Sequence, residues 1–486
     1  MKKSILKTLQ STIQGDVFSQ KEFRKFYSVD ASSYQIIPEL VVVPKNEKDV
    51  VNVINIARKF KTSVTVRGAG TGLVGSALNN GIILEMKNFD SIRLAKDYVT
   101  IGPGTIKGKL DKKLEEYKKF FPPNPSIGSF CSIGGMLGNN SSGSRSLKYG
   151  SVIDNVTEIT FIDGNGNKIT LPKNKRVTKK ILEFAKKIDR NKFPNVTKNS
   201  SGYRIDKVKS INDSHKVFIG SEGTLGIILS AKLRIKDNPR KRILFVIEYK
   251  TIKNAIKNCI EINKTKPSAI EFVDRTTLNQ IKFKFNRKTK CLLFVEYDDK
   301  INSNEKKIKL IVTGKIVNVL KRDLDIYQWW KYRDSSLHYS LKAIIKEKRI
   351  PHVIEDAAVP LENLQKLFSI INKINKKYKT RSVLYGHIGN GNIHVRLISD
   401  RTRIAIIKNI AIQYFDEVIK LGGTITAEHG DGLARSEFVK RQYGVKNYQI
   451  FKQIKKFFDP KNVLNPDKII TKKSMIVKNL ESFLVV

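Results

Sequence analysis

A glycine-rich stretch, residues 64–77, constrains the fold of this chain more than any other segment. It begins as a β-branched run and then places glycines at positions 68, 70, 72 and 75. Glycine adopts backbone angles closed to other residues, and it lets backbone N–H groups approach a bound pyrophosphate without obstruction. Three of these glycines spell the GxGxxG pattern of Rossmann nucleotide folds, but such a unit needs a crossover helix before its next parallel strand. Only residues 76–81 precede the next expected strand, Ile82–Met86. We therefore predict two strands joined directly by a glycine turn; a turn without any ligand is the simpler alternative.

Composition limits the function classes. The 486 residues suffice for two or three domains, and the net charge of +46 would suit nucleic acid, an anionic membrane face or anionic substrates. The lysines are spread through every segment, as expected from a general compositional bias, and no nucleic-acid motif accompanies them. We therefore expect no specific nucleic-acid binding.

The three cysteines, at positions 131, 259 and 291, are far apart and lack CxxC spacing. This pattern favours a reducing compartment and argues against a disulfide or iron–sulfur framework. The basic N-terminus lacks the apolar core of a signal peptide, and no apolar run reaches the length of a membrane span. We expect a cytoplasmic protein, with charge-based peripheral contact at the inner face of the membrane as an option.

Three neighbouring segments resemble the flavin-binding domain of the vanillyl-alcohol oxidase type. Pro38-Glu-Leu-Val-Val-Val-Pro44 is followed by an expected helix at 46–61 and then by Arg67-Gly-Ala-Gly-Thr-Gly72. The resemblance implies FAD, with contacts from Arg67, Gly68, Ala69, Gly70, Thr71, Gly72 and Ser76. Thr71 stands where relatives with covalently attached flavin carry histidine, which implies dissociable FAD.

A second small-residue stretch, 124–150, is too polar to form an apolar core. A flexible linker is one interpretation, but Ile133, Met136 and Leu137 interrupt it. The stretch resembles the SIGG turn and small-residue helix of the same flavin domains. The resemblance implies FAD contacts from Pro125, Ser132, Ile133, Gly134, Gly135, Asn139 and Ser142, and from the later Glu222, Gly223, Ile227 and Asn465.

The turn Gly164-Asn-Gly166 predicts a β-hairpin, and residues 172–195 are expected to be helical. From Ile243 onward, strands and helices alternate, which predicts an antiparallel sheet with helices on one face. This part includes a long helix expected from about Asn302 to Leu320. The fold class is therefore α+β. We expect an N-terminal helical segment (1–37), a two-part FAD-binding domain (38–238), an α+β cap with a metal site (239–440) and a C-terminal helical segment returning to the flavin (441–486).

Three of the six histidines fall in two short motifs, Tyr385-Gly-His-Ile-Gly-Asn-Gly-Asn-Ile-His-Val395 and Ala427-Glu-His-Gly-Asp-Gly432. The first motif predicts a strand, a glycine turn and a strand, which would let His387 and His394 face each other. With Glu428 they offer two imidazoles and a carboxylate, a donor set suited to a catalytic Zn²⁺ with an open position. Spacing alone leaves a structural role for the pair equally open.

Both motifs and the C-terminal Phe458–Pro466 stretch resemble FAD-linked D-2-hydroxyacid dehydrogenases, over residues of about 35 to 470. The resemblance implies His387, His394 and Glu428 as ligands of a divalent metal, expected to be zinc. It implies His429 as catalytic base and Arg333 and Asn392 as substrate contacts. For Arg333, a solvated surface position is the alternative.

The implied reaction oxidises a small D-2-hydroxy acid by hydroxyl deprotonation and hydride transfer to flavin N5, with electrons passed to a quinone, cytochrome or electron-transfer protein. The resemblance implies that D-2-hydroxyglutarate enzymes carry a lysine that helps bind the second carboxylate, in the segment that corresponds to residues 352–360 here. This chain has no lysine in that segment. This favours D-lactate or glycolate. D-2-hydroxyglutarate remains an alternative, as does a non-enzymatic basic protein that binds nucleic acid or a membrane surface on a flavin scaffold. The sequence is also compatible with a homodimer or with a hetero-oligomer that includes other oxidase subunits.

Overall fold

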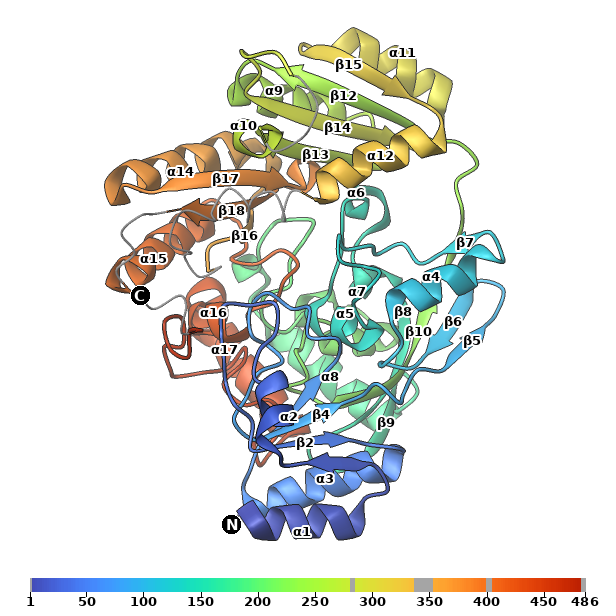
Figure 1. Cartoon of the computed structure of the whole chain (residues 1–486), viewed down its shortest axis with the longest axis vertical. Coiled ribbons are helices and arrows are strands. Elements are labelled where there is room, and N and C mark those ends of the chain that lie inside the picture. Colours follow the sequence, from blue (N-terminus) through green and yellow to red (C-terminus); the bar gives the residue numbers. More distant parts are fainter. Residues whose placement is uncertain (1, 280–284, 336–352, 399–403, 482–486) are drawn as a thin grey trace.

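The computed structural model describes residues 2–279, 285–335, 353–398 and 404–481. Two lobes are stacked along the long axis of the molecule, with the N-terminal half of the chain in one and a large sheet in the other (Figure 1). In the first lobe, the described α-helices are α1 (Lys2–Thr12), α2 (Lys21–Phe26), α3 (Glu47–Phe60), α4 (Lys107–Glu115), α5 (Ile133–Asn139), α6 (Ser146–Tyr149), α7 (Val152–Asn155) and α8 (Lys175–Lys187).

A four-stranded sheet contains the glycine turn. Its strands run in the order β1 (Asp16–Phe18), β2 (Leu40–Val43), β4 (Ile82–Glu85) and β3 (Val64–Arg67). Strands β3 and β4 pair in parallel, and residues 68–81 join them without a helix, which confirms the direct connection. Helix α3 precedes the turn as expected: the Asn46 side chain caps its N-terminus, and Lys61 ends it in a left-handed conformation.

A five-stranded antiparallel sheet completes the first lobe. Its order is β5 (Ile92–Leu94), β6 (Tyr98–Ile101), β10 (Ile227–Arg234), β8 (Val156–Ile162) and β9 (Lys168–Leu171). Directly after β10, β11 (Lys236–Asp237) pairs with β7 (Lys119–Phe120) in a two-stranded sheet. Strands β8 and β9 form the predicted hairpin, with Asp163 accepting from the backbone N–H groups of Asn165 and Asn167. The expected helix within 172–195 is α8.

A seven-stranded antiparallel sheet forms the second lobe. The order is β15 (Lys315–Leu320), β12 (Ile243–Tyr249), β14 (Cys291–Tyr297), β13 (Ala269–Asp274), β17 (Arg381–Gly386), β18 (Asn392–Ile398) and β16 (Asp356–Ala358). The helices in the described part of this lobe are α9 (Ile252–Asn263), α10 (Arg275–Leu278), α11 (Ile301–Ile311), α12 (Asp323–Asp334), α14 (Leu364–Tyr378) and α15 (Ile404–Lys420).

The expectation of helices on one face of this sheet is only partly correct. Helices α9, α14 and α15 share a hydrophobic core with Phe245, Phe272 and alternate neighbours on the sheet. Helix α12, however, packs Trp329 and Trp330 against the opposite face. That face must be covered because β12, β13 and β14 are apolar on both sides, as strands buried between two layers are.

The long helix expected at 302–320 is wrong in its second half. Helix α11 ends at Ile311, and residues 315–320 form β15, which pairs with β12. The segment Lys315-Ile-Val-Asn-Val-Leu320 is β-branched and follows Gly314, and both features favour a strand after a helix end.

The C-terminal part returns to the first lobe, as predicted. Helices α16 (Gly432–Arg435) and α17 (Val439–Phe458) lead back, and Tyr443, Phe451 and Phe458 of α17 belong to the same hydrophobic core as β6 and β8. Leu464 then forms a parallel bridge with Val64 of β3. None of the helices in the described part of the chain combines the length and the apolar composition that a membrane crossing needs.

Candidate active site

A cavity of about 340 Å³ lies where the two lobes meet. Its first wall comes from the glycine turn after β3, from the residues before and within α5, and from the loop before β10. This wall contains most of the predicted FAD contacts: Gly68, Ala69, Gly70, Thr71, Gly72, Ser76, Pro125, Ser132, Gly134, Gly135, Asn139, Ser142, Glu222 and Gly223.

Glycine is required in this wall because other parts of the chain lie against it. A Cβ at Gly68 would lie 2.0 Å from Oγ of Ser132, and Gly70 has a positive φ of +69°. Arg67 lies beneath the turn, with its guanidinium over the ring of Tyr27. The turn thus presents backbone to the cavity rather than side chains, which fits a large, polar, phosphate-bearing cofactor.

Four of the predicted FAD residues do not line the cavity. Arg67 supports the turn, while Ile133 and Ile227 are buried in hydrophobic cores. Asn465 donates from its amide to the carbonyl oxygens of Ser76 and Glu222, and so ties the C-terminal segment to both cavity-lining loops. These residues support the wall, and direct contact with a cofactor remains a prediction for them.

The second wall comes from the sheet of the other lobe, from α12 and from the turn at 427–431 that precedes α16. It contains Arg333, His387, His394, Glu428 and His429, together with Asp334 and Tyr385. Strands β17 and β18 form the predicted hairpin, with Tyr385 paired to His394, so that His387 and His394 approach each other. Five residues expected from separate motifs therefore share one cavity with the glycine turn.

Glu428 is the centre of this cluster. Its Oε1 lies 2.9 Å from Nε2 of His387, 3.3 Å from Nε2 of His394 and 3.6 Å from Nε2 of His429. Donor atoms bound to a tetrahedral zinc at about 2.0–2.1 Å lie roughly 3.3 Å from one another. The separations of Glu428 Oε1 from His387 and from His394 are therefore compatible with a shared divalent cation.

Acidic residues fix the orientation of the His387 and His429 rings. Oε1 of Glu271, on β13, lies 2.8 Å from Nδ1 of His387, and Oε1 of Glu355 lies 2.8 Å from Nδ1 of His429. A ring whose Nδ1–H donates to a carboxylate has its Nε2 lone pair free to bind a metal or accept a proton. Both rings direct Nε2 towards Glu428.

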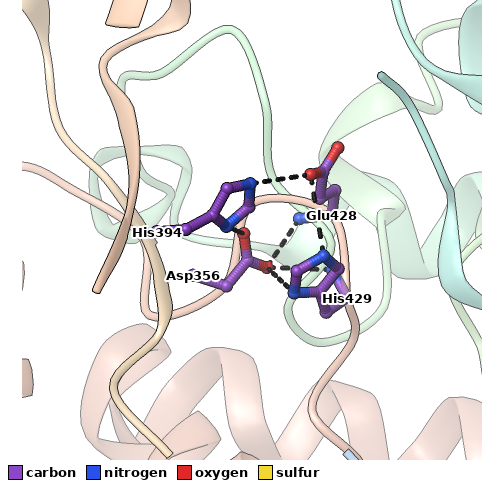
Figure 2. Close-up of side chains that lie close together, drawn as sticks. All are labelled: Asp356, His394, Glu428 and His429. Atoms are coloured by element: carbon purple, nitrogen blue, oxygen red, sulfur yellow. Dashed lines mark hydrogen bonds and ion pairs between the residues drawn. The ribbon is translucent and has the colours of Figure 1, made fainter. Parts of the chain in front are cut away.

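Asp356, His394, Glu428 and His429 form a second set of close donor atoms (Figure 2). Oδ2 of Asp356, however, already accepts from the Thr426 hydroxyl and from the backbone N–H groups of Ala427, Glu428 and His429. Those bonds hold the turn that carries Glu428 and His429. Oδ2 of Asp356 is therefore committed to holding this turn, while His387 lies beside Glu428 but outside this set of close donor atoms.

Charge at the cluster is strongly perturbed. Burial opposes ionisation of Glu428, but Lys198 and His387 hold its pKa well below the usual value. Burial also opposes the charged form of His429, yet Asp356 and Glu355 raise its pKa to about 9. Burial lowers the pKa of His394. The neutral His429 that a general base requires would be favoured by positive charge bound beside it.

The two predicted substrate contacts differ in position. Arg333 is buried on α12; its Nε lies 2.7 Å from Oε2 of Glu271, while Nη1 is 3.4 Å from Oδ1 of Asp334. It lines the cavity and is not the solvated surface residue of the alternative interpretation. Asn392 is fully buried behind the wall, where its amide bonds Ala357 and Lys198. Substrate contact remains a prediction for both.

Sequence reasoning assigned no role to Lys198, Glu271, Glu355 or Asp356. The sequence held a signal for Glu355 and Asp356. These adjacent carboxylates lie within the apolar run Val353-Ile-Glu-Asp-Ala-Ala-Val359 and must find buried partners. Glu271 likewise lies in the apolar strand Ala269-Ile-Glu-Phe-Val273. Lys198 carried no comparable signal in a chain so rich in lysine.

Family models match both lobes. The model "FAD linked oxidases, C-terminal domain" matches residues 238–469, and the model "FAD binding domain" matches residues 38–171. The chain therefore carries both domains of an FAD-linked oxidase. This FAD-linked oxidase thus carries the FAD-binding domain that its glycine turn indicated, and it is an oxidoreductase.

Curated relatives cover most of the chain. The FAD-linked oxidase is 28% identical to glycolate oxidase subunit GlcD of Bacillus subtilis, over 92% of this chain and 93% of the relative. It is 26% identical to D-lactate dehydrogenase of Archaeoglobus fulgidus, over 89% and 91%. It is also 26% identical to D-2-hydroxyglutarate dehydrogenase of Haemophilus influenzae, but there the match spans 94% of this chain and only 50% of the relative.

A solved structure shares the fold. An alkyldihydroxyacetonephosphate synthase superposes with a TM-score of 0.70 at 18% identity, covering 96% of this chain and 85% of that one. This likeness confirms the two-lobed flavin fold.

Proposed function

We propose that this FAD-linked oxidase oxidises a D-2-hydroxy acid, D-lactate or glycolate, to the 2-oxo acid. One observation carries the proposal: a single cavity is bounded by the glycine-rich FAD-binding loops and by the cluster of His387, His394, Glu428 and His429. The relatives named glycolate oxidase subunit and D-lactate dehydrogenase support this substrate class.

The cluster contains the groups that this chemistry needs. His387, His394 and Glu428 would hold a divalent cation, expected to be zinc, which would supply Lewis acidity toward the substrate hydroxyl. His429 accepts the hydroxyl proton at Nε2, while Glu355 holds its Nδ1–H. The FAD-binding family match and the backbone-lined wall support a flavin that accepts the hydride from C2.

Arg333 is assigned to the substrate carboxylate. Because Glu271 engages Nε and Nη2, Nη1 is the nitrogen best placed to donate into the cavity. Such a charge-assisted bond would contribute about 1.5–3 kcal/mol. Asn392 contributes through the buried amide that bonds Lys198.

The same proposal includes the cellular setting. We assign FAD binding to 38–238, the cap to 239–440 and the returning segment to 441–486. Electrons pass to a quinone, a cytochrome or an electron-transfer protein. The protein works in the cytoplasm or at the inner face of the membrane, as a homodimer or with other oxidase subunits.

Anaerobic flavin reduction tests the proposal. The purified protein is mixed with D- and L-lactate, glycolate and D-2-hydroxyglutarate, each with and without a chelator, and the oxidised-flavin absorption band is followed. We expect bleaching by D-lactate or glycolate that the chelator suppresses. If D-2-hydroxyglutarate bleaches the flavin band most strongly, it is the substrate. If D-acids reduce the flavin equally well with and without the chelator, the proposed role of the cation is wrong. A protein that retains DNA in a salt-sensitive way and binds no flavin would support the non-enzymatic alternative.

A further inference from the structure

A buried lysine from the first lobe reaches the central carboxylate of the second. Lys198 lies in the irregular segment after α8, and its side chain is 1% exposed. Its Nζ is 2.8 Å from Oε2 of Glu428 and 3.1 Å from Oδ1 of Asn392. An ammonium group buried this deeply needs a compensating charge, and Glu428 supplies it.

The two oxygens of Glu428 have different surroundings. Oε2 accepts from Lys198 and from the hydroxyl of Ser142. Oε1 faces the Nε2 atoms of His387 and His394. One oxygen is thus held by the first lobe, and the other points towards the donors expected to share a cation.

The lysine is itself fixed from its other side. The Asn392 amide donates to Oδ1 of Asp356 at 3.2 Å and to the Ala357 carbonyl at 3.0 Å. Those two bonds orient the amide so that its oxygen faces Lys198. Because Lys198 therefore has two fixed partners, it cannot follow a rotation of the Glu428 carboxylate without breaking a buried bond.

We propose that Lys198 is a positioning residue that holds Oε2 of Glu428 and so presents Oε1 alone, as a one-oxygen ligand, to the bound divalent cation. The inference rests on the proposed function, because it requires a cation at His387, His394 and Glu428. Without Lys198, Oε2 keeps only the Ser142 hydroxyl as a partner, and we expect the carboxylate to turn and chelate with both oxygens, which raises the coordination number of the cation.

The test replaces the native cation with Co²⁺, whose visible absorption bands weaken as the coordination number rises. In the full-length FAD-loaded protein, Lys198→Met removes the charge at similar side-chain length. We expect a loss of band intensity relative to wild type and an additional Co–O distance by X-ray absorption. Lys198→Gln keeps a neutral donor at this position and is expected to lose less intensity; it preserves the test should the methionine variant not fold.

Lys455→Met is the matched control. Lys455 is also buried, but its Nζ bonds Asp459, the Thr224 carbonyl and the Leu464 carbonyl, outside the donor cluster. We expect this variant to lower thermal stability and to leave the Co²⁺ spectrum unchanged. Bound Co²⁺ with the wild-type spectrum in both Lys198 variants would overturn the inference alone. A wild-type protein that binds no Co²⁺ would overturn the cation in the proposed function and this inference with it.

Discussion

Glu271 Oε1 lies 2.8 Å from Nδ1 of His387, while Oε2 of the same carboxylate lies 2.7 Å from Nε of Arg333. One buried side chain thus orients both a proposed ligand of the cation, His387, and the arginine proposed to bind the substrate carboxylate, Arg333. It lies on the face of β13 that is turned toward α12, whereas Ile270 and Phe272 face the opposite core. Successive side chains of β13 therefore alternate between the hydrophobic core on one face of the sheet and the candidate active site on the other.

Replacing this carboxylate should weaken cation binding. In Glu271→Gln, the amide can accept at one atom only, so it cannot serve both His387 and Arg333. We expect the affinity for Zn²⁺ to fall about 10- to 100-fold, measured by competition with a chromophoric chelator. Glu248→Gln on β12, whose carboxylate bonds Thr289 away from the site, is the control and should bind as wild type does. Equal affinities for both variants would contradict the orienting role.

Removing the proposed base should slow the chemical step and spare the cofactor. For His429→Gln we expect flavin reduction by D-lactate or glycolate to slow by about 10²- to 10⁴-fold, followed by anaerobic stopped flow. Bound FAD per chain should remain unchanged because the residue lies on the opposite wall from the glycine turn. A near-normal reduction rate would assign the proton transfer to another group.

The flavin should leave the protein without breaking a bond. Thr71 lines the cavity, and its hydroxyl is not the imidazole that a histidine-linked flavin would need at this position. Acid precipitation should therefore transfer all of the yellow colour to the supernatant, where chromatography should identify FAD. Colour that stays with the pellet after unfolding would show a covalent linkage.

Acid should destabilise the first lobe through His215. Burial lowers the pKa of His215 to about 4, and among the described residues its Nδ1 has no hydrogen-bond partner, while Nε2 lies 3.0 Å from the Val156 carbonyl. In the unfolded state the pKa of His215 is about 6.5, so the unfolded chain binds the proton more readily than the folded protein does. The free energy of unfolding is therefore highest above a pH of about 6.5, and it falls by on the order of 3 kcal/mol as the pH drops towards 4.

Chemical denaturation across this range checks the effect. His215→Gln cannot be protonated and keeps a donor for the Val156 carbonyl, so its free energy of unfolding should depend less on pH between about 4 and 6.5. The same variant should reduce its flavin at the wild-type rate, which makes it the histidine control for His429→Gln. An unchanged pH dependence would remove His215 as the cause.

Much of the framework was predictable because its signals are local. The glycine turn, the Gly164–Gly166 hairpin, helix α3 and the β17–β18 hairpin each follow from turn residues and caps within a few positions. The error at 302–320 arose because apolar residues continue past the end of α11 at Ile311, and pairing with β12 decides in favour of a strand at 315–320. The histidines and the glutamate proposed as metal ligands and base lie together at the cavity wall, as their motifs indicated. Lys198 and Glu271 were missed because their partners lie 230 and 116 residues away in the chain.

The bridge between Val64 and Leu464 has a consequence for how this chain matures. The nascent first lobe exposes the free edge of β3 until some 400 further residues have been synthesised, which takes roughly 20–80 seconds at about 5–20 residues per second. An exposed strand edge is prone to wrong pairing. Chaperone dependence and aggregation should therefore depend on how promptly the segment that contains Leu464 emerges.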